Sequence, residues 1–132
     1  MGIPTDIAKR GYAAFGQRDI PAILGLLADD VEWTFFGGQT TGTPYGGTYR
    51  GKHEVAAFFQ RLATADEIQE FEPQEFLEGS GHVTVIGRTK GRALPDGKPH
   101  ETHWVHVFFW KDGSDRISRW IGTGDTAARS AP

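Results

Sequence analysis

The residues best suited to acid–base chemistry lie in the last third of the chain. His106 occurs in the aromatic run Glu101–Trp110, and Asp125 follows two closely spaced glycines. An imidazole among aromatic rings can accept or donate a proton near neutral pH, and a carboxylate removed from water becomes a stronger base. Strand alternation separates the two side chains unless a bulge at Gly122 or Gly124 turns Asp125 toward His106. A hydrogen-bonded core histidine and an aspartate in a turn are the simpler alternatives for these residues.

Three histidines spaced three residues apart, His100, His103 and His106, could form a metal-binding motif. Successive strand side chains point to opposite faces, so His103 is predicted on the face opposite the other two. The sequence contains no cysteine, which excludes thiolate metal sites, disulfides and cysteine nucleophiles. We therefore expect no bound metal and no cofactor.

The aromatic run and the segment Arg116–Ile121 predict a β-hairpin, because an Asp-Gly-Ser cluster separates them. A three-residue loop, 112–114, would set these pairs: His106 with Trp120, Trp104 with Gly122 and Phe108 with Ser118. One predicted face is aromatic with a single titratable group, and it carries Thr102, Trp104, His106, Phe108, Trp110 and Trp120. The other is mostly aliphatic and carries His103, Val105, Val107, Phe109, Ile117 and Ile121. The first is typical of a small-molecule site, and the second predicts a homodimer through the outer sheet face.

The chain as a whole has the size and charge of one globular domain. Its 132 residues predict a single domain over 1–132, with a core over about 5–126. A formal charge of −3 without any basic run excludes nucleic acid as the main partner. A membrane role is equally unsupported, since no apolar run approaches the roughly 18 residues that a spanning helix needs. The first six residues lack a secretory signal pattern, so we expect a cytoplasmic protein.

Local patterns predict helices first and strands second. Helices are expected over 5–17, after Asp19 with the stripe Ile20, Ile23, Leu24 and Leu27, and over 52–65. Strands are expected over 31–36, 68–78 and 82–94, before the hairpin. Residues 37–51 contain six glycines and predict an irregular loop or lid that holds Tyr45 and Tyr49. This order predicts an α+β domain with helices on one face of a curved sheet.

Several segments carry a family resemblance, in order and over nearly the whole chain. They are Tyr12–Phe15, Asp19–Ile20, Asp30–Trp33, Gly47–Gly51, Glu72–Phe76, Trp104–Phe108 and Asp125–Ala127. Together they resemble the SnoaL-like branch of the nuclear transport factor 2-like, ketosteroid isomerase-like superfamily. The resemblance implies a cone-shaped barrel in which three N-terminal helices pack on a curved, mostly antiparallel sheet around an apolar cavity. It also implies a dimer through the outer sheet face.

The resemblance implies several possible activities, from isomerisation, ring closure and dehydration to binding alone. Phe35 stands where ketosteroid isomerases have their catalytic carboxylate, so that base is missing. Tyr12 and His106 correspond to the tyrosine and acid that stabilise an oxyanion in those enzymes. SnoaL-type cyclases use a late aspartate with a nearby histidine, and Asp125 and His106 are the matching residues.

Two hypotheses follow. In the first, the protein is a cofactor-independent cyclase, isomerase or dehydratase that acts on a hydrophobic carbonyl compound. His106 or Asp125 would then be the base, and Tyr12 or the Trp104 N–H would donate to the oxyanion. In the second, the cavity binds or carries a hydrophobic small molecule without chemistry. Eight further side chains, which could equally be ordinary core or loop packing, are the candidate ligand contacts: Trp33, Phe35, Tyr45, Tyr49, Phe58, Trp104, Phe108 and Trp120.

Overall fold

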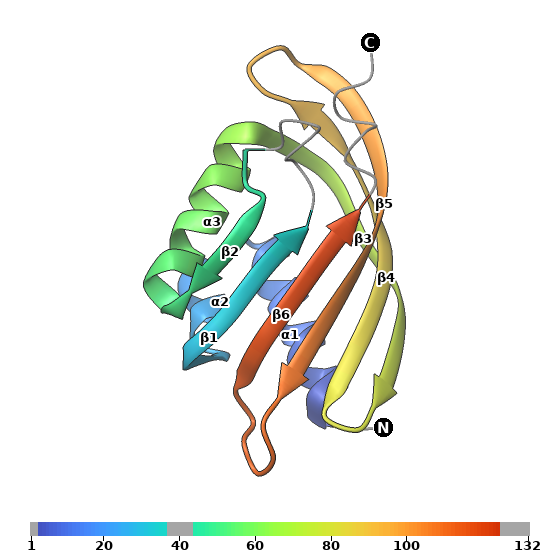
Figure 1. Ribbon diagram of the computed structural model, residues 1–132. Coiled ribbons are helices and arrows are strands. Elements are labelled where there is room, and N and C mark those ends of the chain that lie inside the picture. The colour runs from blue at the N-terminus through green and yellow to red at the C-terminus, as the bar shows by residue number, and fades with distance from the viewer. Residues whose placement is uncertain (1–2, 37–43, 125–132) are drawn as a thin grey trace.

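The computed structural model describes residues 3–36 and 44–124 and has the predicted α+β architecture (Figure 1). Its helices are α1 (Ile3–Gly16), α2 (Ile20–Leu24) and α3 (Gly51–Ala65). Its strands are β1 (Leu27–Phe36), β2 (Gly47–Arg50), β3 (Asp66–Gly79), β4 (His82–Ala93), β5 (Lys98–Trp110) and β6 (Ile117–Gly124). The strands form one strongly curved, open sheet with the helices on its concave side. Among the described helices, none is both long and apolar enough to span a membrane.

The second helix is shorter than predicted. It starts as expected, because the Asp19 carboxylate accepts the Ala22 N–H at 3.2 Å and Pro21 lies in the first turn. It ends at Leu24, and Leu27 is already the first residue of β1, where it pairs with Ile117. The helical position predicted for Leu27 is therefore wrong. So short a helix has little stability of its own, and the sheet hydrogen bonds of the next residues prevail.

In the described residues the sheet has six strands, one more than the five that the sequence predicts. The strand order is β2-β1-β6-β5-β4-β3, and every neighbouring pair is antiparallel except β1 and β6, which are parallel. Strand β2 lies inside the stretch that was expected to be a loop or lid, and it pairs with β1 so that Tyr49 is opposite Trp33. Residues 37–43 of that stretch lie outside the described part. This four-residue strand could not be predicted from the glycine-rich sequence around it, because its stability comes from pairing with β1 rather than from its own residues.

The hairpin of β5 and β6 has the predicted faces but a different register. Its pairs are Trp104 with Gly124, His106 with Gly122, and Phe108 with Trp120, two residues from the predicted pairs. A two-residue shift leaves every side chain on its predicted face. Ile117 is the exception, because an irregularity next to Trp110 turns it inward, where it is 2% exposed.

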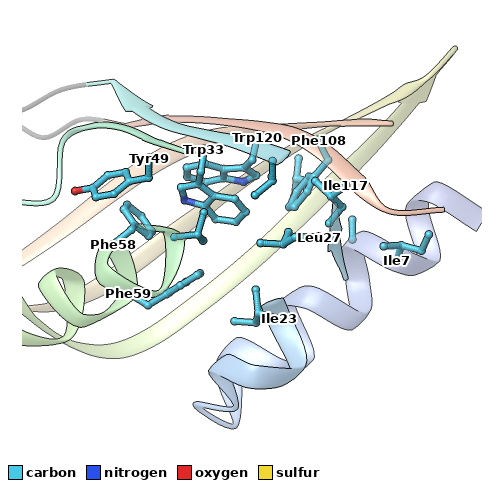
Figure 2. Packing of buried hydrophobic residues seen from close by; sticks show 14 of the residues in the cluster. Ile7, Ile23, Leu27, Trp33, Tyr49, Phe58, Phe59, Phe108, Ile117 and Trp120 are labelled. Carbon is cyan, nitrogen blue, oxygen red and sulfur yellow. The ribbon is translucent and has the colours of Figure 1, made fainter. Parts of the chain in front are cut away.

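Aromatic rings fill the concave side of the sheet, as Figure 2 shows for part of the cluster. Trp33 from β1 and Trp120 from β6 stack with ring centroids 4.2 Å apart, and Phe58 of α3 packs against both. The Trp120 indole lies over Gly122, where a Cβ atom would come within 2.2 Å of the ring. An indole can lie flat on the sheet at this point only because glycine has no side chain.

Candidate functional site

A pocket of about 130 Å³ lies between the concave face of the sheet and the three helices. Such a volume is close to that of engineered cavities of about 150 Å³ that bind benzene. Most of the wall is aromatic or aliphatic, including Phe15, Ile23, Leu27, Phe59, Leu62, Ile68, Phe71 and Ile117. The polar side chains in the wall are Tyr12, Tyr45, Asp66, Thr89, His100, Thr102 and His106. The pocket therefore suits a small, mostly apolar molecule with a few polar groups.

The structure brings most of the candidate residues together in this wall. Nine of them line it: Tyr12, Trp33, Phe35, Tyr45, Phe58, Trp104, His106, Phe108 and Trp120. Tyr49 is buried but is not part of the wall, and its hydroxyl donates to the Tyr45 carbonyl oxygen at 3.0 Å and accepts from Arg61 at 3.1 Å. Asp125 lies outside the described residues.

The Tyr12 hydroxyl and the Nδ1 atom of His106 are hydrogen-bonded at 2.8 Å. Helix α1 supplies Tyr12, and the inward face of β5 supplies His106, which is 9% exposed. Burial raises the pKa of Tyr12 far above its usual value and lowers the pKa of His106 from 6.5 to about 3. Both side chains are therefore uncharged at neutral pH, and a histidine with so low a pKa is a weak base.

The Tyr12–His106 pair leaves one hydrogen-bond donor for a ligand in either tautomer. If the phenol donates to Nδ1, the imidazole proton is on Nε2. If Nδ1–H donates to the phenol oxygen, the phenol O–H can donate elsewhere. The imidazole ring also stacks on Trp104, with centroids 4.0 Å apart and planes 14° apart, which fixes its orientation.

The indole N–H groups differ from the expectation. Trp104 Nε1 donates to the Thr89 hydroxyl oxygen at 2.8 Å, so it is not available as the expected oxyanion donor. Trp33 Nε1, in contrast, is buried and has no hydrogen-bond partner among the described residues. Sequence patterns could not separate the two indoles, because the difference depends on a threonine from the neighbouring strand.

A second polar group in the wall joins the predicted site residue Tyr45 to Asp66 and His100, which were not predicted as site residues. The Tyr45 hydroxyl donates to Asp66 Oδ2 at 2.8 Å, and His100 Nε2 lies 3.3 Å from Asp66 Oδ1. The Asp66 and His100 side chains are each 4% exposed. Asp66 is the first residue of β3 and reaches His100 of β5 across β4, where Gly91 pairs with both Ile68 and His100. The only sequence signal was that His100 shares its strand face with His106.

The three histidines of β5 do not converge. His103 is exposed on the outer face, opposite Arg88 of β4, while His100 and His106 line the pocket. This is the division that strand alternation predicted. Within 3–36 and 44–124, no cluster of three or more potential metal ligands occurs.

Comparisons with known proteins agree on one family and one fold. The family model described as "SnoaL-like domain" matches residues 8–120. An NTF2-like protein of unknown function from Burkholderia pseudomallei K96243 is 32% identical, with a TM-score of 0.83 over 96% of this chain and 94% of that one. An NTF2-like protein from Burkholderia thailandensis E264 is 28% identical, with a TM-score of 0.84 over 97% and 95%.

A third similar structure is that of TerC co-crystallised with polyporic acid. TerC is 28% identical, with a TM-score of 0.81 over 96% of this chain and 95% of its own. No curated protein sequence matches the chain.

Proposed function

The chain belongs to the SnoaL-like domain family, and we propose that it is a cofactor-independent isomerase, cyclase or dehydratase for a hydrophobic carbonyl compound. The observation that supports this proposal is the Tyr12–His106 pair, bonded at 2.8 Å in the wall of an otherwise largely apolar pocket. TerC, which was co-crystallised with polyporic acid, supports a small organic ligand.

The pair would act on the carbonyl oxygen of the ligand. Acid–base reactions next to a carbonyl place negative charge on that oxygen, and a fixed donor in a dry site stabilises the charge strongly. Burial keeps the Tyr12 phenol protonated, because its pKa is raised, so the donor is present throughout the physiological pH range. Neither partner needs to change its protonation state to bind the ligand.

Binding of a matched pair of naphthalenes tests the carbonyl contact. Isothermal titration calorimetry would compare naphthalene with 2-acetonaphthone, which adds one ketone to the same rings. The double variant Tyr12→Phe, His106→Leu removes every donor of the pair. It should weaken 2-acetonaphthone about 2- to 13-fold, the worth of one hydrogen bond of roughly 0.5–1.5 kcal/mol, and leave naphthalene unchanged.

The control variant is His103→Leu, which makes the same histidine change three residues away on the exposed face of β5. It should bind both compounds as the wild type does. An equal loss of both compounds in the double variant would mean that the pair only supports the fold. A wild type that binds neither compound would contradict the proposed function.

The alternative function, binding without chemistry, is favoured by one observation. Tyr12 and His106 are both neutral at pH 7, so this pair contains no ready base. Deuterium exchange at the methyl group of 2-acetonaphthone distinguishes the two functions. An enzyme of the proposed kind accelerates the exchange in D2O, whereas a carrier binds the ketone and leaves the exchange rate unchanged.

We also propose that the outer face of the sheet forms a homodimer contact. Val105 is 36% exposed there, and Val107, Phe109 and Ile121 are half-buried. Arg119 lies over the Phe109 ring, with its Cζ atom 5.1 Å from the ring centroid. An apolar centre with charged neighbours is the usual composition of a subunit contact.

A further inference from the structure

A hydrogen-bonded chain of three side chains, Tyr45–Asp66–His100, forms part of the pocket wall apart from the Tyr12–His106 pair. We infer that His100, oriented by Asp66, accepts the proton of a ligand hydroxyl, so that the pocket takes an elongated conjugated molecule with a hydroxyl at one end and a carbonyl at the other. This inference rests on the proposed function, because it places the carbonyl at the Tyr12–His106 pair.

The contacts of Asp66 determine which nitrogen of His100 is available. An ionised carboxylate only accepts hydrogen bonds, and Asp66 Oδ2 already accepts the Tyr45 hydroxyl at 2.8 Å. The nitrogen that faces Oδ1 at 3.3 Å, Nε2, therefore carries the proton. In a neutral imidazole the other nitrogen, Nδ1, then has a free lone pair.

The Nδ1 atom of His100 is the unexplained polar atom of this region. It is buried and has no hydrogen-bond partner among the described residues. Buried polar atoms nearly always have partners, so an atom without one in a pocket wall needs an explanation. A ligand O–H matches this lone pair, because a hydroxyl can donate to an unprotonated imidazole nitrogen.

The two histidines of the inward face have different partners. Nε2 of His100 faces the Asp66 carboxylate oxygen Oδ1 at 3.3 Å. The hydrogen-bond partner of His106 is instead the neutral phenol of Tyr12, at 2.8 Å. The two histidines of the inward face therefore have different roles: His106 helps to hold a donor, and His100 accepts a proton.

The proposed step is a proton transfer without an oxidant or a cofactor. The O–H bond of the ligand breaks, and a bond forms between the proton and Nδ1 of His100. The electron pair stays on the ligand and is delocalised through the conjugated system onto the carbonyl oxygen. That oxygen accepts the hydrogen bond from the Tyr12–His106 pair. His100 and the Tyr12–His106 pair therefore contact opposite ends of the conjugated system that carries the negative charge.

The spacing of the two histidines sets the length of the ligand. His100 and His106 are on the same face of β5 and six residues apart, about 20 Å along a fully extended strand. The sheet is curved (Figure 1), and both residues line the pocket on its concave side. A ligand that contacts both side chains must therefore extend along β5 between them.

The test uses 6-hydroxy-2-acetonaphthone, which has the hydroxyl and the ketone at opposite ends of a naphthalene. In the wild type, this compound should bind about 2- to 13-fold more tightly than 2-acetonaphthone, as one added hydrogen bond implies. The absorption band of the naphtholate should also grow on binding at neutral pH. His100→Leu should abolish both effects when each variant's affinity for this compound is compared with its own affinity for 2-acetonaphthone, and His103→Leu should change neither.

Asp66→Asn tests the positioning role. This variant should still bind the hydroxyl compound, but the naphtholate band should not appear, because the carboxylate that stabilises the imidazolium is gone. If His100→Leu does not fold, nitrogen NMR of the wild type gives the same information. His100 Nδ1 should be unprotonated in the free protein and gain a proton when 6-hydroxy-2-acetonaphthone is added.

Two results would overturn the inference. One is a hydroxyl effect on affinity that survives in His100→Leu, and the other is a proton on Nδ1 of His100 in the free protein. Neither depends on the carbonyl contact, which is measured by 2-acetonaphthone against naphthalene. Failure of the proposed function and failure of this inference therefore give different results.

Discussion

Acidification should destabilise the protein through His106, and His106→Gln should remove that part of the pH dependence. The pKa of His106 is lowered by burial from 6.5 to about 3 in the folded chain. Between these values, the unfolded chain binds a proton on this histidine and the folded chain does not. The stabilisation is therefore complete above about pH 6.5 and is lost as the pH falls toward about 3.

The magnitude follows from the two pKa values. Between about pH 7 and about pH 5, protonation of this histidine in the unfolded chain lowers the free energy of unfolding by about 2 kcal/mol. Below pH 5 the loss continues at about 1.4 kcal/mol per pH unit. The amide that replaces the imidazole in His106→Gln can keep a hydrogen bond to Tyr12 but does not titrate, so the variant isolates this contribution.

Urea denaturation of wild type, His106→Gln and His103→Gln at several pH values would measure the effect. All other titrating groups contribute equally to the wild type and His106→Gln. The free energy of unfolding of the wild type, relative to that of His106→Gln, should therefore fall by about 2 kcal/mol from about pH 7 to about pH 5. His103 is exposed on the outer face, and its variant should follow the wild type. A His106→Gln curve parallel to the wild-type curve would refute the buried, uncharged imidazole.

Three further predictions concern packing and assembly. Gly122→Ala should cost about 1–3 kcal/mol in denaturation experiments, because the new Cβ would meet the Trp120 ring at 2.2 Å, whereas Gly16→Ala, with nothing within 4 Å, should not. Thr89→Val should cost about 1–3 kcal/mol by leaving Trp104 Nε1 buried without an acceptor; an unchanged melting temperature would contradict this. Light scattering should give twice 14.5 kDa for the wild type and 14.5 kDa for Val105→Lys, and a monomeric wild type would rule out the dimer.

Strand faces could be predicted from the sequence because the two-residue alternation is local. Trp104, His106 and Phe108 all point inward as expected. The register could not be predicted, because it depends on the length of the connection before β6 and on an irregularity beside Trp110. The same irregularity turned Ile117 to the inner face, which no alternation rule anticipates.

The candidate site could be predicted in part, because single residues can be identified from local patterns but the contacts between them cannot. Tyr12 and His106 were identified separately, but their hydrogen bond depends on how α1 lies across the sheet. The Asp66–His100 contact was invisible, because it joins residues 34 positions apart through the order of three strands. An aspartate at the end of a helix has many possible roles, and only the tertiary structure shows which histidine it faces.

The parallel pairing of β1 with β6 has a consequence for how the protein is made. Strand β1 emerges from the ribosome before the other strands, but its neighbour β6, which includes Trp120 opposite Trp33, follows β2, β3, β4 and β5 in the chain. Until then, the edges of β1 and β5 that pair with β6 have no hydrogen-bonding partner. Such non-local pairing slows folding and exposes apolar surface to other nascent chains. A chaperone that holds the nascent chain would therefore be needed most before Ile117 has been translated.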